Sequence, residues 1–181
     1  MPKFITIGNF TIDHIILPNG ASMPKQMGGA CLYAAMGIRL WSTEIGIVSV
    51  VSPIYPEEWL SAIKEIGFDL AGIRRSEMDD GMEGVMIYSA DGSRKATSAK
   101  TYPPDWSEDQ IIRREVDLWR EYSPQSNDIP ESYFSSIGAH VAPMPVARQN
   151  DCLKALHTRI STITIDPPWW ERSQIRGEYP L

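Results

Sequence analysis

Two runs typical of β-strands are followed by polar residues that could bind a ligand or move a proton. Asn9 and Asp13 come after 4–8 (Phe-Ile-Thr-Ile-Gly), and Asp166 comes directly after 160–165. In α/β sheets, ligands bind beyond the carboxyl ends of the strands, where these side chains are expected. The Asp13 carboxylate could accept paired hydrogen bonds from sugar hydroxyls, although an Asx-type turn is the alternative. Asp166 is a candidate acid or base, but Asp-Pro-Pro is also a common way to leave a strand.

A pair of glycines, Gly28-Gly29, stands directly before 30–41, a stretch rich in Ala, Leu and Met that predicts a helix. Glycines allow a ligand to approach the backbone closely, and a helix N-terminus offers free N–H groups to a hydroxyl or an anion. A plain sharp turn is the alternative for this pair. The sequence has no G-x-G-x-x-G after its first strand and no G-x-x-x-x-G-K-[ST], so a dinucleotide-binding protein is disfavoured and a P-loop kinase is excluded.

The composition narrows the class of protein. The 181 residues carry a net charge of −6 and are 43% hydrophobic, as in a globular protein without a basic surface for nucleic acid. No signal peptide is recognisable, and no apolar run approaches the roughly 20 residues of a membrane helix. Cys31 and Cys152 are far apart and the three histidines form no cluster, so neither a disulfide framework nor a metal site is expected. These features favour the cytoplasm, with Cys31 a small buried side chain rather than a nucleophile.

Strand-like and helix-like segments alternate along the chain, which predicts an α/β sheet with mainly parallel strands. The β-branched run 45–51 is typical of a strand covered on both faces. Trp59, Ile63 and Ile66 recur at i, i+4 and i+7, which predicts one buried face on the helix between Pro56 and Gly67. Further strands are expected at 4–8, 14–17, 70–74, 137–142 and 160–165, and a further helix at 146–157.

The middle of the chain predicts an antiparallel hairpin. Segments 84–89 and 93–98 flank Asp91-Gly92, the strongest short-range signal for a tight hairpin turn. Side chains of unlike character alternate in the first of these segments, as expected of a strand with two different faces.

A third helix is expected after this hairpin. Ser107 and Gln110 have the spacing of a capping box, and Ile112, Val116 and Trp119 form one apolar stripe on the segment that follows. This stripe is therefore expected to pack in the core. The same position is expected for two other helical tryptophans, Trp41 and Trp59.

Three of these segments follow one another in an order that resembles a known family. They are 4–13 (F-I-T-I-G-N-F-T-I-D), 28–35 (G-G-A-C-L-Y-A-A) and 66–73 (I-G-F-D-L-A-G-I). They resemble the opening strand of the PfkB (ribokinase-like) kinases, with its substrate-binding aspartate, the di-glycine signature that follows, and a later G-[IV]-D-[LT] run. The predicted hairpin falls where that family has a small β lid, and the resemblance covers nearly the whole chain.

The resemblance implies a ribokinase-like fold, in which three layers (α/β/α) surround a mainly parallel sheet. One domain over 1–181 is expected, with lid strands at about 14–25 and 83–101. Such enzymes transfer the γ-phosphate of MgATP to a hydroxymethyl group of a sugar or nucleoside. The implied substrate contacts are Asp13, Gly28, Gly29 and Tyr33, with Asn9 and Asp166 as further candidates, and Tyr33 takes the place of an asparagine found in many members.

The sequence also departs from the family pattern. Ala30-Cys31 replaces the Lys-Gly of ribokinases, and Ser52-Pro53-Ile54 replaces a Gly-x-Asp turn. The catalytic segment of the family, D-T-x-G-A-G-D, and its magnesium-associated N-x-x-E motif have no counterpart in the 181 residues. No residue is therefore named as catalytic or metal-binding, and ATP and Mg are expected only for a complete family member.

These departures leave three hypotheses. The chain is expected to be a PfkB-type kinase truncated on its C-terminal side and inactive alone. The alternatives are a non-catalytic sugar- or nucleoside-binding protein, and an interaction protein that pairs through an exposed sheet edge. A homodimer through the lid or that edge is a further expectation, and neither nucleic acid nor a membrane is an expected partner.

Overall fold

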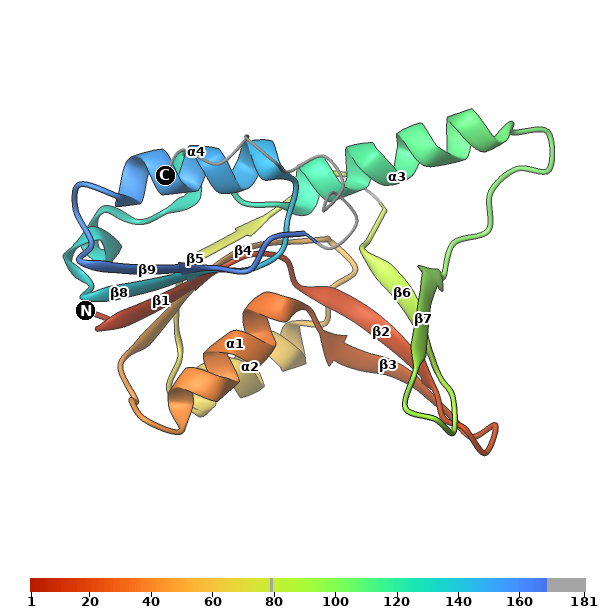
Figure 1. The fold of residues 1–181 in the computed structure, drawn as a ribbon, viewed down its shortest axis with the longest axis horizontal. Helices are drawn as coiled ribbons and strands as arrows, with labels where there is room; N and C mark the ends of the chain where they lie inside the picture. The colour runs from red at the N-terminus through yellow and green to blue at the C-terminus, as the bar shows by residue number, and fades with distance from the viewer. Residues whose placement is uncertain (79, 169–181) are drawn as a thin grey trace.

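The computed structural model describes residues 1–78 and 80–168. The tail from Trp169 to Leu181, for which the sequence favours at most a single helical turn, lies outside the described residues. Within the described part, the chain forms a body around one sheet and a second, smaller sheet that projects from it (Figure 1). None of the described helices is both long enough and apolar enough to cross a membrane.

The body is built on a five-stranded parallel sheet with the order β5-β4-β1-β8-β9. Its strands are β1 (Phe4–Ile7), β4 (Ile45–Val51), β5 (Asp69–Arg75), β8 (Gly138–Val141) and β9 (Thr162–Ile165). One face is covered by α1 (Ala30–Arg39) and α2 (Glu57–Glu65), and the other by α4 (Val146–Leu156) and the end of α3 (Glu108–Tyr122) (Figure 1). The expected three-layer α/β/α architecture with a mainly parallel sheet is confirmed.

Apolar side chains fill both sides of this sheet because successive residues of a strand point to opposite faces. Ile47 packs among the residues of α1 and α2, whereas the adjacent Val48 packs towards α4. β4 is buried along its whole length, as its β-branched run predicts. Cys31 is fully buried in the first of these clusters, and burial raises the pKa of its thiol to about 12, so it is the inert side chain that the sequence indicates.

The second sheet has the order β3-β2-β6-β7. It contains β2 (Thr11–Ile16), β3 (Ser22–Gly28), β6 (Glu83–Tyr88) and β7 (Arg94–Ser98). The pairs β2–β3 and β6–β7 are antiparallel hairpins, and β2 and β6 join them in parallel. The hairpin predicted around Asp91-Gly92 is present, with Gly92 at a φ of 83° that favours glycine.

The prediction that the apolar stripe of α3 packs in the core is wrong. Ile112 and Val116 are 51% and 41% exposed, and the buried residues of this helix are Leu118 and Tyr122, which pack with Val50. The reason is tertiary, because α3 extends past the body and only its last turns lie over the sheet (Figure 1). The capping box of Ser107 and Gln110, which depends on local sequence alone, is present.

Two further core predictions fail at helix ends. Trp41 is 89% exposed because α1 ends at Arg39, before the tryptophan could turn inward. Ile66 is 41% exposed at the C-cap of α2, whereas Trp59 packs against the core as predicted.

Candidate functional site

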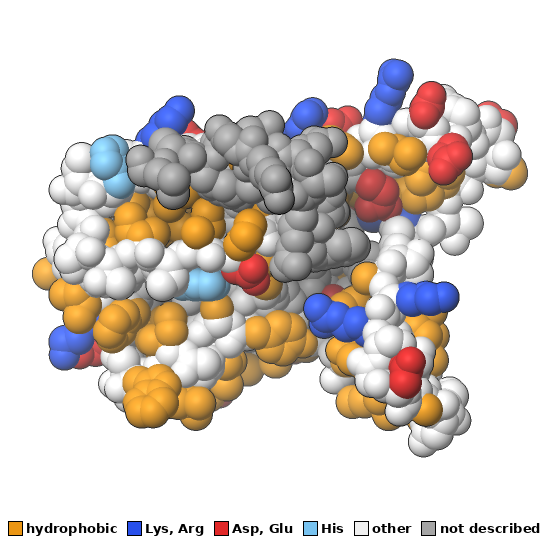
Figure 2. Space-filling view, viewed as in Figure 1, with side chains coloured by type: hydrophobic (Ala, Val, Ile, Leu, Met, Phe, Trp, Pro, Cys, Tyr) orange, Lys and Arg blue, Asp and Glu red, His pale blue; other side chains and the backbone are white. Residues whose placement is uncertain are grey.

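A cleft of about 590 Å³ lies between the second sheet and the carboxyl ends of β1, β8 and β9. Figure 2 shows the second sheet standing apart from the body, with basic side chains beside the gap between them. Five of the six site residues predicted from sequence line this cleft, and the sixth, Gly28, packs against one of them; the five are Asn9, Asp13, Gly29, Tyr33 and Asp166. Asn9 and Asp166 follow β1 and β9, whose carboxyl ends share one edge of the parallel sheet, whereas β2 contributes Asp13 and the start of α1 contributes Gly29 and Tyr33.

Asp13 lies within strand β2, paired with Gln26 on one side and Gly84 on the other. Its Oδ1 accepts a hydrogen bond of 2.8 Å from the Thr11 hydroxyl, two residues away on the same face of the strand. Burial raises the pKa of Asp13, and the Thr11 hydrogen bond opposes this shift only in part. The carboxylate is thus partly desolvated, so a ligand that donates hydrogen bonds to it would offset the lost hydration.

The two glycines leave space for different neighbouring atoms close to this carboxylate. A Cβ atom on Gly28 would overlap the Asp13 carboxylate and would lie 2.5 Å from the Thr11 Oγ1. Gly29 has a φ of 105°, and a Cβ there would overlap the Asn9 carbonyl oxygen and lie 2.9 Å from the Phe10 Cα. The missing side chain of Gly28 therefore leaves room for the side chains of Asp13 and Thr11, whereas that of Gly29 leaves room for the backbone of Asn9 and Phe10.

Gly29 is also the N-cap of α1, so this helix begins at the wall of the cleft. The N-terminus of a helix carries a partial positive charge, which favours electron-rich ligand atoms nearby. Tyr33, one turn into α1, is 58% exposed, and its hydroxyl donates to the Met27 carbonyl at 3.5 Å. Burial and the charge of Asp13 both raise the pKa of Tyr33, because its ring lies near that carboxylate.

Asn9 has a mainly structural environment. It is 3% exposed, and its Nδ2 donates to the Tyr122 carbonyl at 2.8 Å and to the Ser123 hydroxyl at 3.0 Å. It thereby ties the end of β1 to the end of α3. Asp166 is exposed and lines the cleft directly after β9, and its backbone N–H donates to the Val141 carbonyl at 2.9 Å.

No protein-family model matches the chain. A cytidine kinase of Thermococcus kodakarensis is 26% identical over 171 residues, which are 94% of this chain and 54% of that kinase. The solved nucleoside kinase of Methanocaldococcus jannaschii, a member of the ribokinase family, superposes with a TM-score of 0.65 at 17% identity. The chain is related to the PfkB family of carbohydrate kinases.

Its fold is ribokinase-like over almost its whole length. The alignment with the M. jannaschii enzyme covers 95% of this chain and 54% of that structure. The fructokinase of Xylella fastidiosa, solved with bound ATP, gives a TM-score of 0.62 at 16% identity over 99% of this chain and 56% of that one. The chain therefore spans about half the length of these relatives.

Several residues of the cleft were not predicted from the sequence. The charge of Arg94 in β7 opposes part of the burial-driven rise in the pKa of Asp13, and Lys100, just after the same strand, lines the wall of the cleft. The alternation of β7 could have shown that Arg94, Ala96 and Ser98 share one face, because side chains of a strand repeat every second residue. The sequence could not show which face of β7 lines the cleft.

The described lining residues suit an uncharged ligand rich in hydroxyl groups better than they suit a nucleoside triphosphate. Among the described lining residues, the carboxylates of Asp13, Glu83, Glu115 and Asp166 outnumber the cations of Arg94 and Lys100, and no D-T-x-G-A-G-D segment occurs in the 181 residues. Among the described residues, no group of three or more His, Cys, Asp or Glu is arranged to hold a metal ion. No step of phosphoryl transfer is therefore assigned to these side chains.

Proposed function

We propose that the chain forms the acceptor-binding part of a PfkB-type kinase, which transfers a phosphoryl group from ATP to a hydroxyl group of a nucleoside or sugar. The relationship to a cytidine kinase and the fold shared with an ATP-bound fructokinase support this proposal. In this function the cleft binds the alcohol that receives the phosphoryl group, and the second sheet (β3-β2-β6-β7) acts as a lid over the cleft.

The observation that carries the proposal is the environment of Asp13. This carboxylate is partly desolvated, is oriented by Thr11, and lies over a glycine whose missing side chain makes room for it. A carboxylate held in this way accepts two hydrogen bonds from neighbouring hydroxyl groups, which fixes the orientation of a sugar ring. A ribose moiety offers such a pair of donors, and holding it in one orientation is a large part of catalysis in phosphoryl transfer.

Of the two acceptor classes, a nucleoside fits the cleft better than a free sugar. The exposed ring of Tyr33 lies near Asp13, and Met86 and Trp119 line the same cleft. Flat aromatic and apolar surfaces bind the face of a base, which a free sugar lacks.

Isothermal titration calorimetry with cytidine, other nucleosides, ribose and fructose tests the proposal. We expect saturable binding of at least one nucleoside, and we expect Asp13→Asn to weaken it at least about tenfold, since a hydrogen bond to a charged group contributes roughly 1.5–3 kcal/mol. Asp109→Asn, at an exposed position in the first turn of α3, is the matched control and should bind like the unaltered chain.

Two results would contradict the proposal. One is the absence of binding for every compound tested. The other is equal affinity in the Asp13→Asn variant, which would show that the carboxylate does not contact the ligand. Incubation with ATP and mass analysis of the product then test whether the ligand that binds is also phosphorylated.

A further inference from the structure

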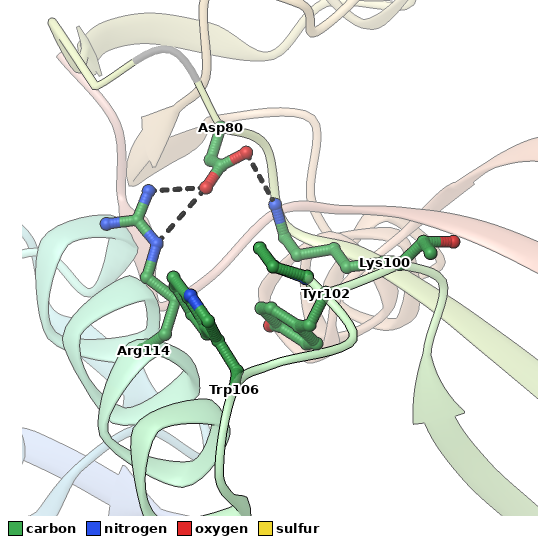
Figure 3. Close-up of a pocket in the computed structure, with 7 residues that line it drawn as sticks. Asp80, Lys100, Tyr102, Trp106 and Arg114 are labelled. Carbon is green, nitrogen blue, oxygen red and sulfur yellow. Dashed lines mark hydrogen bonds and ion pairs between the residues drawn. The ribbon is translucent and has the colours of Figure 1, made fainter.

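Three segments of the chain meet at the carboxylate of Asp80 (Figure 3). Asp80 lies in the connection from β5 to β6, and its Oδ1 is 3.1 Å from the ammonium group of Lys100, in the connection from β7 to α3. Its Oδ2 accepts two hydrogen bonds from the Arg114 guanidinium on α3, one of them 3.2 Å from Nε. A single carboxylate thus joins both connections of the β6–β7 hairpin to one helix.

Neighbouring contacts fasten the same connections to α3. The Tyr122 hydroxyl donates to the Met78 carbonyl at 3.0 Å and to the Asp80 carbonyl, which holds the backbone of the incoming connection. In the outgoing connection, the Tyr102 hydroxyl donates to Glu115, and its ring stacks on Trp106 with centroids 5.5 Å apart. The hairpin therefore leaves the body through two connections that α3 holds at several points.

This junction forms part of the wall of the candidate site. Lys100 and Glu115 line the cleft, and Lys100 also lines a second cavity of about 490 Å³ on the side of Trp106. The side chain of Lys100 is only 15% exposed, so its charge is balanced mainly by Asp80. The hydrogen bond from Arg114 is the largest cause of a lowered pKa at Asp80, so the two cations stabilise the ionised form of this carboxylate.

We propose that Asp80 is a positioning residue, which locks the β6–β7 hairpin onto α3 and holds Lys100 in the wall of the cleft. Without the negative charge, the cations of Lys100 and Arg114 face each other and repel. The β6–β7 hairpin forms half of the second sheet. Loss of the Asp80 contacts therefore lets that half of the sheet move relative to the body. The effect on ligand binding rests on the proposed function, whereas the effect on hairpin motion does not.

Hydrogen exchange followed by mass spectrometry, on the full chain without ligand, tests the lock directly. In Asp80→Asn, which keeps the shape and removes the charge, amides of residues 83–98 should exchange about fivefold faster, while amides of β1 and β4 stay unchanged. Lys100→Met breaks the same ion pair from the other side and should act in the same direction. Glu131→Gln removes a more exposed ion pair with Arg159, remote in sequence from the hairpin, and should leave residues 83–98 unchanged.

Calorimetry with the best-binding nucleoside then measures the second part of the proposal. Asp80→Asn should lower the affinity about fivefold without abolishing it, whereas Asp13→Asn should lower affinity and leave hairpin exchange unaltered. Unchanged exchange of residues 83–98 in both Asp80→Asn and Lys100→Met overturns the inference, whatever the ligand result. Accelerated exchange with no binding by the unaltered chain supports the lock and contradicts the proposed function instead.

Discussion

The adjacent glycines Gly28 and Gly29 should respond to alanine in opposite ways. At Gly29 the φ of 105° disfavours any side chain, and the added Cβ would meet backbone atoms of Asn9 and Phe10, which cannot rotate away. The left-handed backbone costs about 1–2 kcal/mol and the overlap about 1–3 kcal/mol. We therefore expect Gly29→Ala to lose about 3 kcal/mol and to melt roughly 6–12 °C lower, as followed by circular dichroism.

At Gly28 the three atoms nearest to an added Cβ all belong to side chains, those of Asp13 and Thr11. The carboxylate can rotate away at low cost, so Gly28→Ala should melt within about 4 °C of the unaltered chain. The rotated carboxylate would no longer point where a ligand needs it. We expect ligand affinity to fall at least about tenfold, the same loss as in Asp13→Asn.

Gly92→Ala separates the two contributions at Gly29. Gly92 has a φ of 83°, but a Cβ there would meet nothing within 4 Å, so only backbone strain remains. We expect a loss of about 1 kcal/mol, or roughly 2–4 °C. Equal melting temperatures for the Gly29 and Gly92 variants would refute the overlap with the backbone, and unchanged affinity in Gly28→Ala would refute the link between this glycine and Asp13.

Three further predictions follow from single groups. Gly37 is exposed in α1 with open space around it, so Gly37→Ala should gain about 0.5–1 kcal/mol, measured by urea unfolding. The Tyr55 hydroxyl is buried without a hydrogen-bond partner among the described residues, so Tyr55→Phe should melt at the same or a slightly higher temperature. Burial raises the pKa of Asp13, so this carboxyl gains its proton at a higher pH than an ordinary aspartate. Ligand affinity measured by calorimetry should therefore fall with decreasing pH before 3.8 is reached, and the fall should vanish in Asp13→Asn.

Features that depend on neighbouring residues could be predicted from the sequence. The β-branched run of β4 forms the fully buried strand that it indicates, and Asp91-Gly92 turns the hairpin of β6 and β7. The capping box at Ser107 forms because its two hydrogen bonds need only four consecutive residues. The order of these elements was enough to predict the family relationship and the edge of the sheet where the cleft lies.

Features that depend on the placement of whole elements could not be predicted. Ile112 and Val116 have helical spacing, but the sequence does not show that α3 extends beyond the sheet that would cover them. The ion pairs of Asp80 join residues 20 and 34 positions apart, through segments without regular periodicity. Only the packing of α3 beside both connections brings these charges together.

The structure also bears on the alternative in which Asp13 is a turn residue. An Asx turn uses the carboxylate to accept a backbone N–H two residues further on, and it occurs where the chain reverses. Asp13 lies inside a strand that is paired on both sides, and the hydrogen bond to its carboxylate comes from the hydroxyl of Thr11. The chain keeps a partly desolvated charge there, although burial of a carboxylate costs stability. Such local costs gather where a site must present a group to a ligand, which favours binding as the role of Asp13.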